Sequence, residues 1–227
     1  MNVPIIAGSV HIHAYLPTPE DRMMEAEQVR ELLLQSLEHE RGSVDVYQIA
    51  IKCARRDDLK DEWERRIFDT RERELLLTEV CRKLGINPEH MTCGREVSKH
   101  LGAALSSAME LAHESGQLKT AQLIAAECVT LAETTTHSNW QLLAQCARHS
   151  AEDEKDVLAA AVGAVEDEVH KHYYRAHGWQ RELHLQALGI QAILPPPEER
   201  EEVMTPLSAA HVEQGRQSDS LGSQRSS

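Results

Sequence analysis

Aromatic residues are scarce in this chain of 227 residues: Phe, Trp and Tyr together make up 4% of it. Glycine and proline are also few, with 11 and 8 copies, and three of the prolines are consecutive at positions 195–197. Because these two residues are the usual breakers of helices, the middle of the chain has room for long helices. The apolar residues are mainly Leu, Ala, Val and Ile, and the first two favour helices.

The sequence has no apolar run of 18 residues, so we expect no membrane partner and no membrane-spanning helix. The apolar residues 3–8 lack a basic leader and are too short for a signal peptide, which predicts a cytoplasmic protein. The formal net charge is −13. Since such a surface repels phosphate backbones, we expect no nucleic-acid partner.

The five cysteines form no CxxC pair, and most of them lie among apolar residues. They are odd in number and widely spaced, at positions 53, 81, 93, 128 and 146. This pattern indicates reduced thiols in a protein core, not a disulfide framework or a zinc site.

Apolar residues recur at steps of three and four along five segments, which is the period of an amphipathic helix. The helices that this period predicts are 21–54, 59–84, 96–114, 118–148 and 152–176, with a short helix at 179–188 that follows Gly178. Short connections imply antiparallel neighbours. We therefore expect an all-α antiparallel four-helix bundle over residues 21–194, in which 96–114 is an extra crossover helix.

The two ends of the chain differ from this middle part. Residues 1–20 contain three prolines and are expected to be irregular. From Pro195 the composition changes to Pro, Glu, Ser, Gln and Gly, which favours a disordered tail over 195–227 that is available to a protein partner.

Polar residues interrupt the apolar stripes near the middle of each long helix. These residues are Glu40; Thr70 and Glu74; Glu133 and His137; and Glu168 and His172. Antiparallel packing brings helix midpoints to one level, so we expect a buried polar layer. Because buried charge is costly when it is not compensated, such carboxylates need a cation or one another. Carboxylate and imidazole ligands suit a pair of iron or manganese ions.

Over about residues 25–177 the chain resembles the ferritin-like superfamily. In rubrerythrin-like members a ligand Glu precedes a core Tyr by seven residues, and Glu40 and Tyr47 keep this spacing. The layout of a helix hairpin, the loop after Leu84-Gly85, a shorter crossover helix and a second hairpin is similar to the small stress-associated proteins of the YciF type. The resemblance implies a homodimer, and a dinuclear site with Glu-x-x-His on the second and fourth bundle helices.

The sequence departs from that ligand pattern. The helix 59–84 has no histidine, and Thr70-x-x-Arg73 stands where the motif is expected. Two alternatives therefore stay open. In one, the chain is a stress-related, non-enzymatic ferritin-like protein in which the metal pair is absent and Arg73 bonds the carboxylates. In the other, it is a di-iron or di-manganese oxidoreductase of the ferroxidase or peroxide-consuming type. The ligand set for that second alternative is Glu40, Glu74, Glu133, His137, Glu168 and His172.

Overall fold

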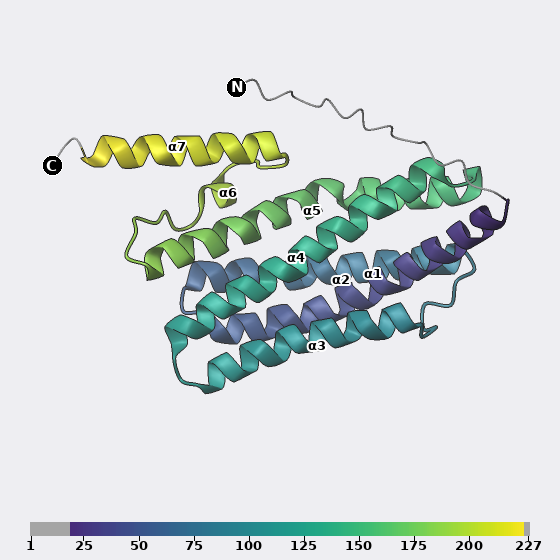
Figure 1. Cartoon of the computed structure of the whole chain (residues 1–227), viewed down its shortest axis with the longest axis horizontal. Helices are drawn as coiled ribbons and strands as arrows, with labels where there is room; N and C mark the ends of the chain where they lie inside the picture. Colours follow the sequence, from purple (N-terminus) through teal and green to yellow (C-terminus); the bar gives the residue numbers. More distant parts are fainter. Residues whose placement is uncertain (1–18, 225–227) are drawn as a thin grey trace, which may run out of the picture.

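The structure is a computed structural model that describes residues 19–224, including the side chains of residues 26–151 and 153–218. Seven helices and no strands occur in these residues (Figure 1). The helices are α1 (Pro19–Cys53), α2 (Asp57–Lys83), α3 (Cys93–Glu114), α4 (Leu118–His149), α5 (Glu152–Ala187), α6 (Pro197–Arg200) and α7 (Pro206–Gln224). The prediction of an all-α chain is confirmed for this part. The expected irregular segment 1–20 falls mostly outside the described residues, and its last two residues begin α1.

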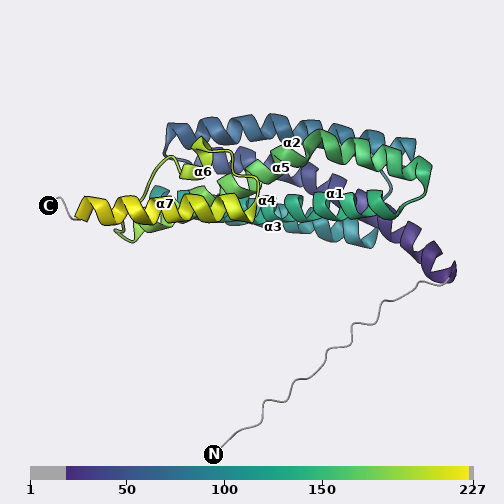
Figure 2. The ribbon, with the colours of Figure 1, turned by 90° about the horizontal axis from the view of Figure 1, so that it is seen from above.

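The long helices pack against one another along a common direction (Figures 1 and 2). α1 contacts α2, α3 and α4, and α4 packs along much of α5. α2 contacts both α1 and α5. α3 lies against α1 and α4. Among the described helices, none is both long and apolar enough to cross a membrane.

Two apolar clusters fill the interior of the packed helices. One contains Leu33 and Leu37 of α1, with Leu77 and Leu143 from α2 and α4. The other begins at Val46, further along α1, and extends over α3, α4 and the C-terminal half of α5. The segment of α1 between the clusters carries buried Glu38, Glu40 and Ser43. The interior is therefore divided by a polar layer at the level of Glu40.

Glycine permits a close approach between two of these helices. A Cβ atom added to Gly42 of α1 would lie 3.6 Å from the Cα atom of Gly102 in α3. This distance is an ordinary van der Waals contact, so the backbones of α1 and α3 come close together at the two glycines.

The predicted end of the fifth long helix before Gly178 is wrong, because α5 continues through Gly178 to Ala187. The expected short helix 179–188 is thus the last part of α5. Gly178 is helical and faces the side chains of Pro196 and Glu198. Its missing side chain makes room for Pro196 and for Glu198 of α6.

The structure also differs from the expectation of a disordered tail from Pro195. α6 and α7 lie within that segment, and Glu198, Val203 and Val212 are buried. Arg216 Nη1 of α7 donates to Glu182 Oε1 of α5 over 3.3 Å. The composition of the tail does not predict this docking, because the docking rests on two valines and a few ion pairs. The division of the chain into domains stays a prediction.

Candidate functional site

The polar layer draws its side chains from four helices. Glu40 comes from α1, Arg73 from α2, Glu133 from α4, and Glu168 and His172 from α5. Glu40, Arg73 and Glu133 are each exposed by 1% or less. Glu168 is about one-third exposed and marks the solvent edge of the layer. Antiparallel packing thus brings residues that are more than 90 positions apart into one group.

Arg73 is the centre of this group. Its Nε donates to Glu40 Oε2 over 3.1 Å, and its Nη1 donates to Glu168 Oε1 over 2.8 Å. Its Nη2 donates to Thr70 Oγ1 over 3.0 Å and lies 4.0 Å from Glu133 Oε1. The three carboxylates raise the pKa of Arg73 against the opposing effect of burial, which alone would lower it. The fixed fork of a guanidinium suits this role, because it donates in several directions at once.

Glu133 is held by a tyrosine as well as by the arginine. The Tyr47 hydroxyl donates to Glu133 Oε1 over 2.5 Å. The second oxygen of Glu133 is buried and has no hydrogen-bond partner among the described residues. Burial raises the pKa of Glu133, although Arg73 and Tyr47 oppose that shift. The orphaned oxygen thus adds to the cost of holding a charged carboxylate in the core, and Arg73 and Tyr47 offset part of that cost.

Trp140 donates from Nε1 to Glu40 Oε1 over 3.1 Å. Because Arg73 takes the other oxygen of Glu40, both oxygens of this buried carboxylate are bonded. The bond from α4 to α1 completes a network that links α1, α2, α4 and α5.

A second arginine borders His172. Arg66 Nη1 donates to Asp69 Oδ2 over 2.8 Å and contacts His172 Nε2. Arg73 Nη1 lies 3.3 Å from His172 Nδ1. Burial, followed by the charges of Arg66 and Arg73, holds the pKa of His172 well below its usual range. The ring is therefore neutral, so only one of its nitrogens accepts from an arginine, either Nδ1 from Arg73 or Nε2 from Arg66.

The structure brings four of the six predicted ligand residues together: Glu40, Glu133, Glu168 and His172. Glu74 is elsewhere. It accepts from Arg41 Nε over 3.0 Å at the surface, because it follows Arg73 by one residue and is turned by about 100° around α2.

His137 is also absent from the layer. It lies between α4 and α5, where its ring stacks on Tyr173 with centroids 4.4 Å apart. Glu133 and His137 are four residues apart, which is a little more than one helical turn, and His137 is partly exposed. The stripe on α4 thus includes Glu133 but leaves His137 at its edge.

Sequence reasoning missed Arg66 and Asp69. With Glu168 and His172, Asp69 forms a group whose potential ligand atoms lie within 4.8 Å of one another. The available signal was the spacing on α2: Arg66, Asp69 and Arg73 follow at steps of three and four and share a face. The sequence prediction includes only Thr70 and Arg73 from that face.

The residues of the layer do not fit a dinuclear metal centre. A guanidinium with three bonded directions lies among Glu40, Glu133 and Glu168, and a second one bonds Asp69. α2 places Thr70 and Arg73 where a ligand Glu and His were expected, and its carboxylate, Asp69, is bonded by Arg66. Two cations beside two guanidinium groups would be repelled, so the donor set is that of an ion-pair network.

Comparisons with known protein families, with curated proteins and with solved structures found no match for this chain.

Proposed function

We propose that this chain is a non-enzymatic member of the ferritin-like fold, in which Arg73 takes the place of the metal pair. The observation that carries the proposal is the position of Arg73, which is fully buried and donates to Glu40 and Glu168 beside Glu133. The arrangement of α1, α2, α4 and α5, with α3 alongside, supports the ferritin-like layout. In this proposal the network stabilises one packing of the long helices and performs no redox step.

The test is metal content and metal binding. Untagged protein purified without chelator should contain neither iron nor manganese in stoichiometric amounts, and titration with Fe²⁺ or Mn²⁺ under anaerobic conditions should give no binding at the layer. Two iron or manganese ions per chain would overturn the proposal.

A variant tests the role of Arg73 directly. Arg73→His removes the guanidinium and restores an imidazole on α2, so we expect gained affinity for Fe²⁺ or Mn²⁺. Arg95→His is the matched control, because Arg95 is also fully buried and donates to Glu38 Oε2 over 2.8 Å outside the layer. Equal metal binding by both variants would show that Arg73 does not occupy the cation position.

A second candidate function is a metal-dependent oxidoreductase of the ferroxidase or peroxide-consuming type. The group of Asp69, Glu168 and His172 favours it, because two carboxylates and an imidazole suit iron or manganese. An ion there would have to displace Arg66 from Asp69 and Arg73 from Glu168. Oxygen consumption on addition of Fe²⁺ to the protein would favour this candidate.

A homodimer is also part of the proposal. The outer face of α3 supports it, because Val97, Leu101 and Leu111 are exposed by 53%, 59% and 71%. They follow the apolar spacing of one helix face. Light scattering of the purified chain tests this part.

A further inference from the structure

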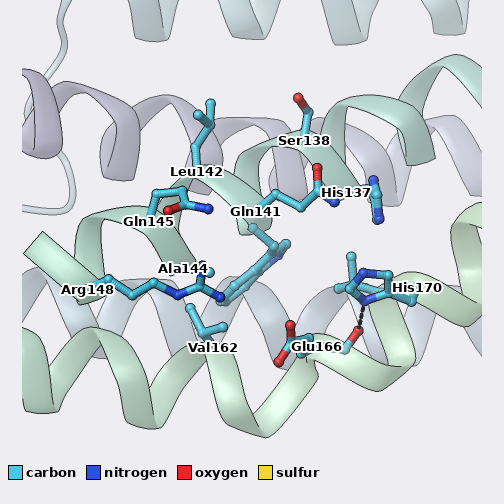
Figure 3. A pocket seen from close by; sticks show the side chains of 12 residues that line it. His137, Ser138, Gln141, Leu142, Ala144, Gln145, Arg148, Val162, Glu166 and His170 are labelled. Carbon is cyan, nitrogen blue, oxygen red and sulfur yellow. Dashed lines mark hydrogen bonds between the residues drawn. The ribbon is translucent and has the colours of Figure 1, made fainter. Parts of the chain in front are cut away.

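His137 and His170 are paired between α4 and α5, away from the polar layer. Their ring centroids lie 4.8 Å apart and their planes are inclined by 89°. Both rings line one end of a cavity of about 370 Å³, whose wall also includes Gln141 and Glu166 (Figure 3). The pair uses one residue of each helix, so its geometry depends on the packing of α4 on α5.

The tautomer of His170 follows from its hydrogen bond. Nδ1 lies 2.7 Å from the carbonyl oxygen of Glu166, one turn earlier in α5. A carbonyl oxygen only accepts, so Nδ1 carries the proton and Nε2 of the neutral ring keeps a free lone pair. A backbone carbonyl on the other nitrogen is the usual way in which a metal-ligating histidine is oriented.

His137 has a buried nitrogen that lacks a partner. Its Nε2 is shielded from solvent and has no hydrogen bond to any described residue. Burial, together with His170 and His177, lowers the pKa of His137. The stacking on Tyr173 fixes the plane of the ring. A neutral, oriented imidazole with an unsatisfied nitrogen is costly without a ligand.

The separation of the rings matches two ligands of one ion. With metal–nitrogen bonds of about 2.0–2.1 Å, two imidazoles on one ion at angles of roughly 90–110° place their ring centres about 4.5–5.3 Å apart. The observed 4.8 Å lies within that interval. The cavity beside the rings has space for water ligands, and the Glu166 carboxylate lines it within one turn of His170.

We propose that His137 and His170 bind one borderline divalent cation, Zn²⁺ or Cu²⁺, across the α4–α5 contact, with water in the remaining positions. Imidazole nitrogen favours these cations over Mg²⁺ or Mn²⁺. The ion would hold the two helices together outside the polar layer. The site is independent of the proposed function, since it uses none of the residues that Arg73 bonds.

The test uses the untagged full chain, with Zn²⁺ followed by calorimetry and Cu²⁺ by electron paramagnetic resonance. We expect one ion per chain and a Cu²⁺ signal with coupling to two nitrogens. The variants are His137→Phe, which keeps a ring against Tyr173, and His170→Phe. Mutation of a residue that only hydrogen-bonds to a metal ligand already lowers metal affinity by about 10–100-fold. Each imidazole is a direct ligand in this proposal, so its loss should lower the affinity by at least that factor.

The matched control is His149→Phe. His149 is exposed on α4, and its Nδ1 also bonds a backbone carbonyl one turn earlier, at 2.8 Å from Gln145 O. Its replacement should leave affinity and stoichiometry unchanged. Absence of Zn²⁺ and Cu²⁺ binding by the wild-type chain, or unchanged binding by a folded double variant of His137 and His170, would overturn the proposal. Neither result bears on iron or manganese at Arg73.

Discussion

Arg73 of α2 donates from Nε to Oε2 of Glu40 in α1 over 3.1 Å, and both side chains are almost completely buried. The pair joins two helices at the level where the apolar core is interrupted. The pair stabilises the folded state only when both partners are present, because the apolar interior solvates neither charge and each compensates the other.

Replacing Arg73 with methionine should therefore strongly destabilise the protein. The variant leaves Glu40 without its cation and removes the donor that Glu168 shares, and loss of one partner of a buried pair costs about 3–5 kcal/mol. The free energy of unfolding, measured with urea, checks this. Lys83→Met is the control, because Lys83 pairs with Glu79 at the surface and exposed pairs contribute about 0–1 kcal/mol. Equal losses in the two variants would contradict a central role for Arg73.

The helices could largely be predicted from the sequence, because each carries an apolar stripe of the right period. The level of the polar layer could also be predicted, since Glu40, Glu133 and His172 interrupt such stripes and are buried. Arg73 could be named because it falls where a ligand histidine was expected. These successes rest on periodicity within single helices.

The failures arise where rotation around a helix or long-range contacts decide the outcome. Glu74 and His137 lie near the correct level but turn toward Arg41 and Tyr173. Arg66 shares a face of α2 with Asp69, but its contact with His172 of α5 is not specified by the spacing on α2. The burial of Val212 depends on docking of the tail, a tertiary effect that composition does not contain.

Gly178→Ala should destabilise the protein, although alanine favours a helix by up to about 1 kcal/mol. A Cβ atom at this position would lie 2.6 Å from Glu198 Oε2 and 3.1 Å from Pro196 Cβ. The carboxylate is not free to move away, because Arg181 donates to its two oxygens over 2.7 and 3.0 Å. Overpacking of this kind costs about 1–3 kcal/mol.

Gly163→Ala is the matched control for that variant. Gly163 lies in the same helix, and an added Cβ atom would meet no atom within 4 Å. The change should raise the free energy of unfolding by up to about 1 kcal/mol. If Gly178→Ala were equally stabilising in urea unfolding, the close approach of Pro196 and α6 to α5 would be refuted.

We expect Glu199 of α6 to make the docking of this segment depend on pH. It lies beside Arg175 and Trp179 of α5 and faces Glu62 and Arg65 of α2. Burial, and then the neighbouring Glu62 carboxylate, raise the pKa of Glu199 to about 7. In the unfolded chain this carboxyl has its ordinary pKa of 4.5. Between that pH and about 7 the folded state therefore keeps a proton that the unfolded chain has released.

The sign of the effect follows from linkage. Because the folded pKa is raised, the contribution of Glu199 to stability is fully present below pH 4.5 and is lost as the pH rises through about 7. Glu199→Gln cannot ionise, so its free energy of unfolding should fall less than that of the wild type between about pH 5.5 and about pH 8. Glu201→Gln, at an exposed position in the same segment, should retain the wild-type slope. Urea unfolding at both pH values checks this, and parallel slopes for wild type and Glu199→Gln would show that the Glu199 proton does not stabilise the fold.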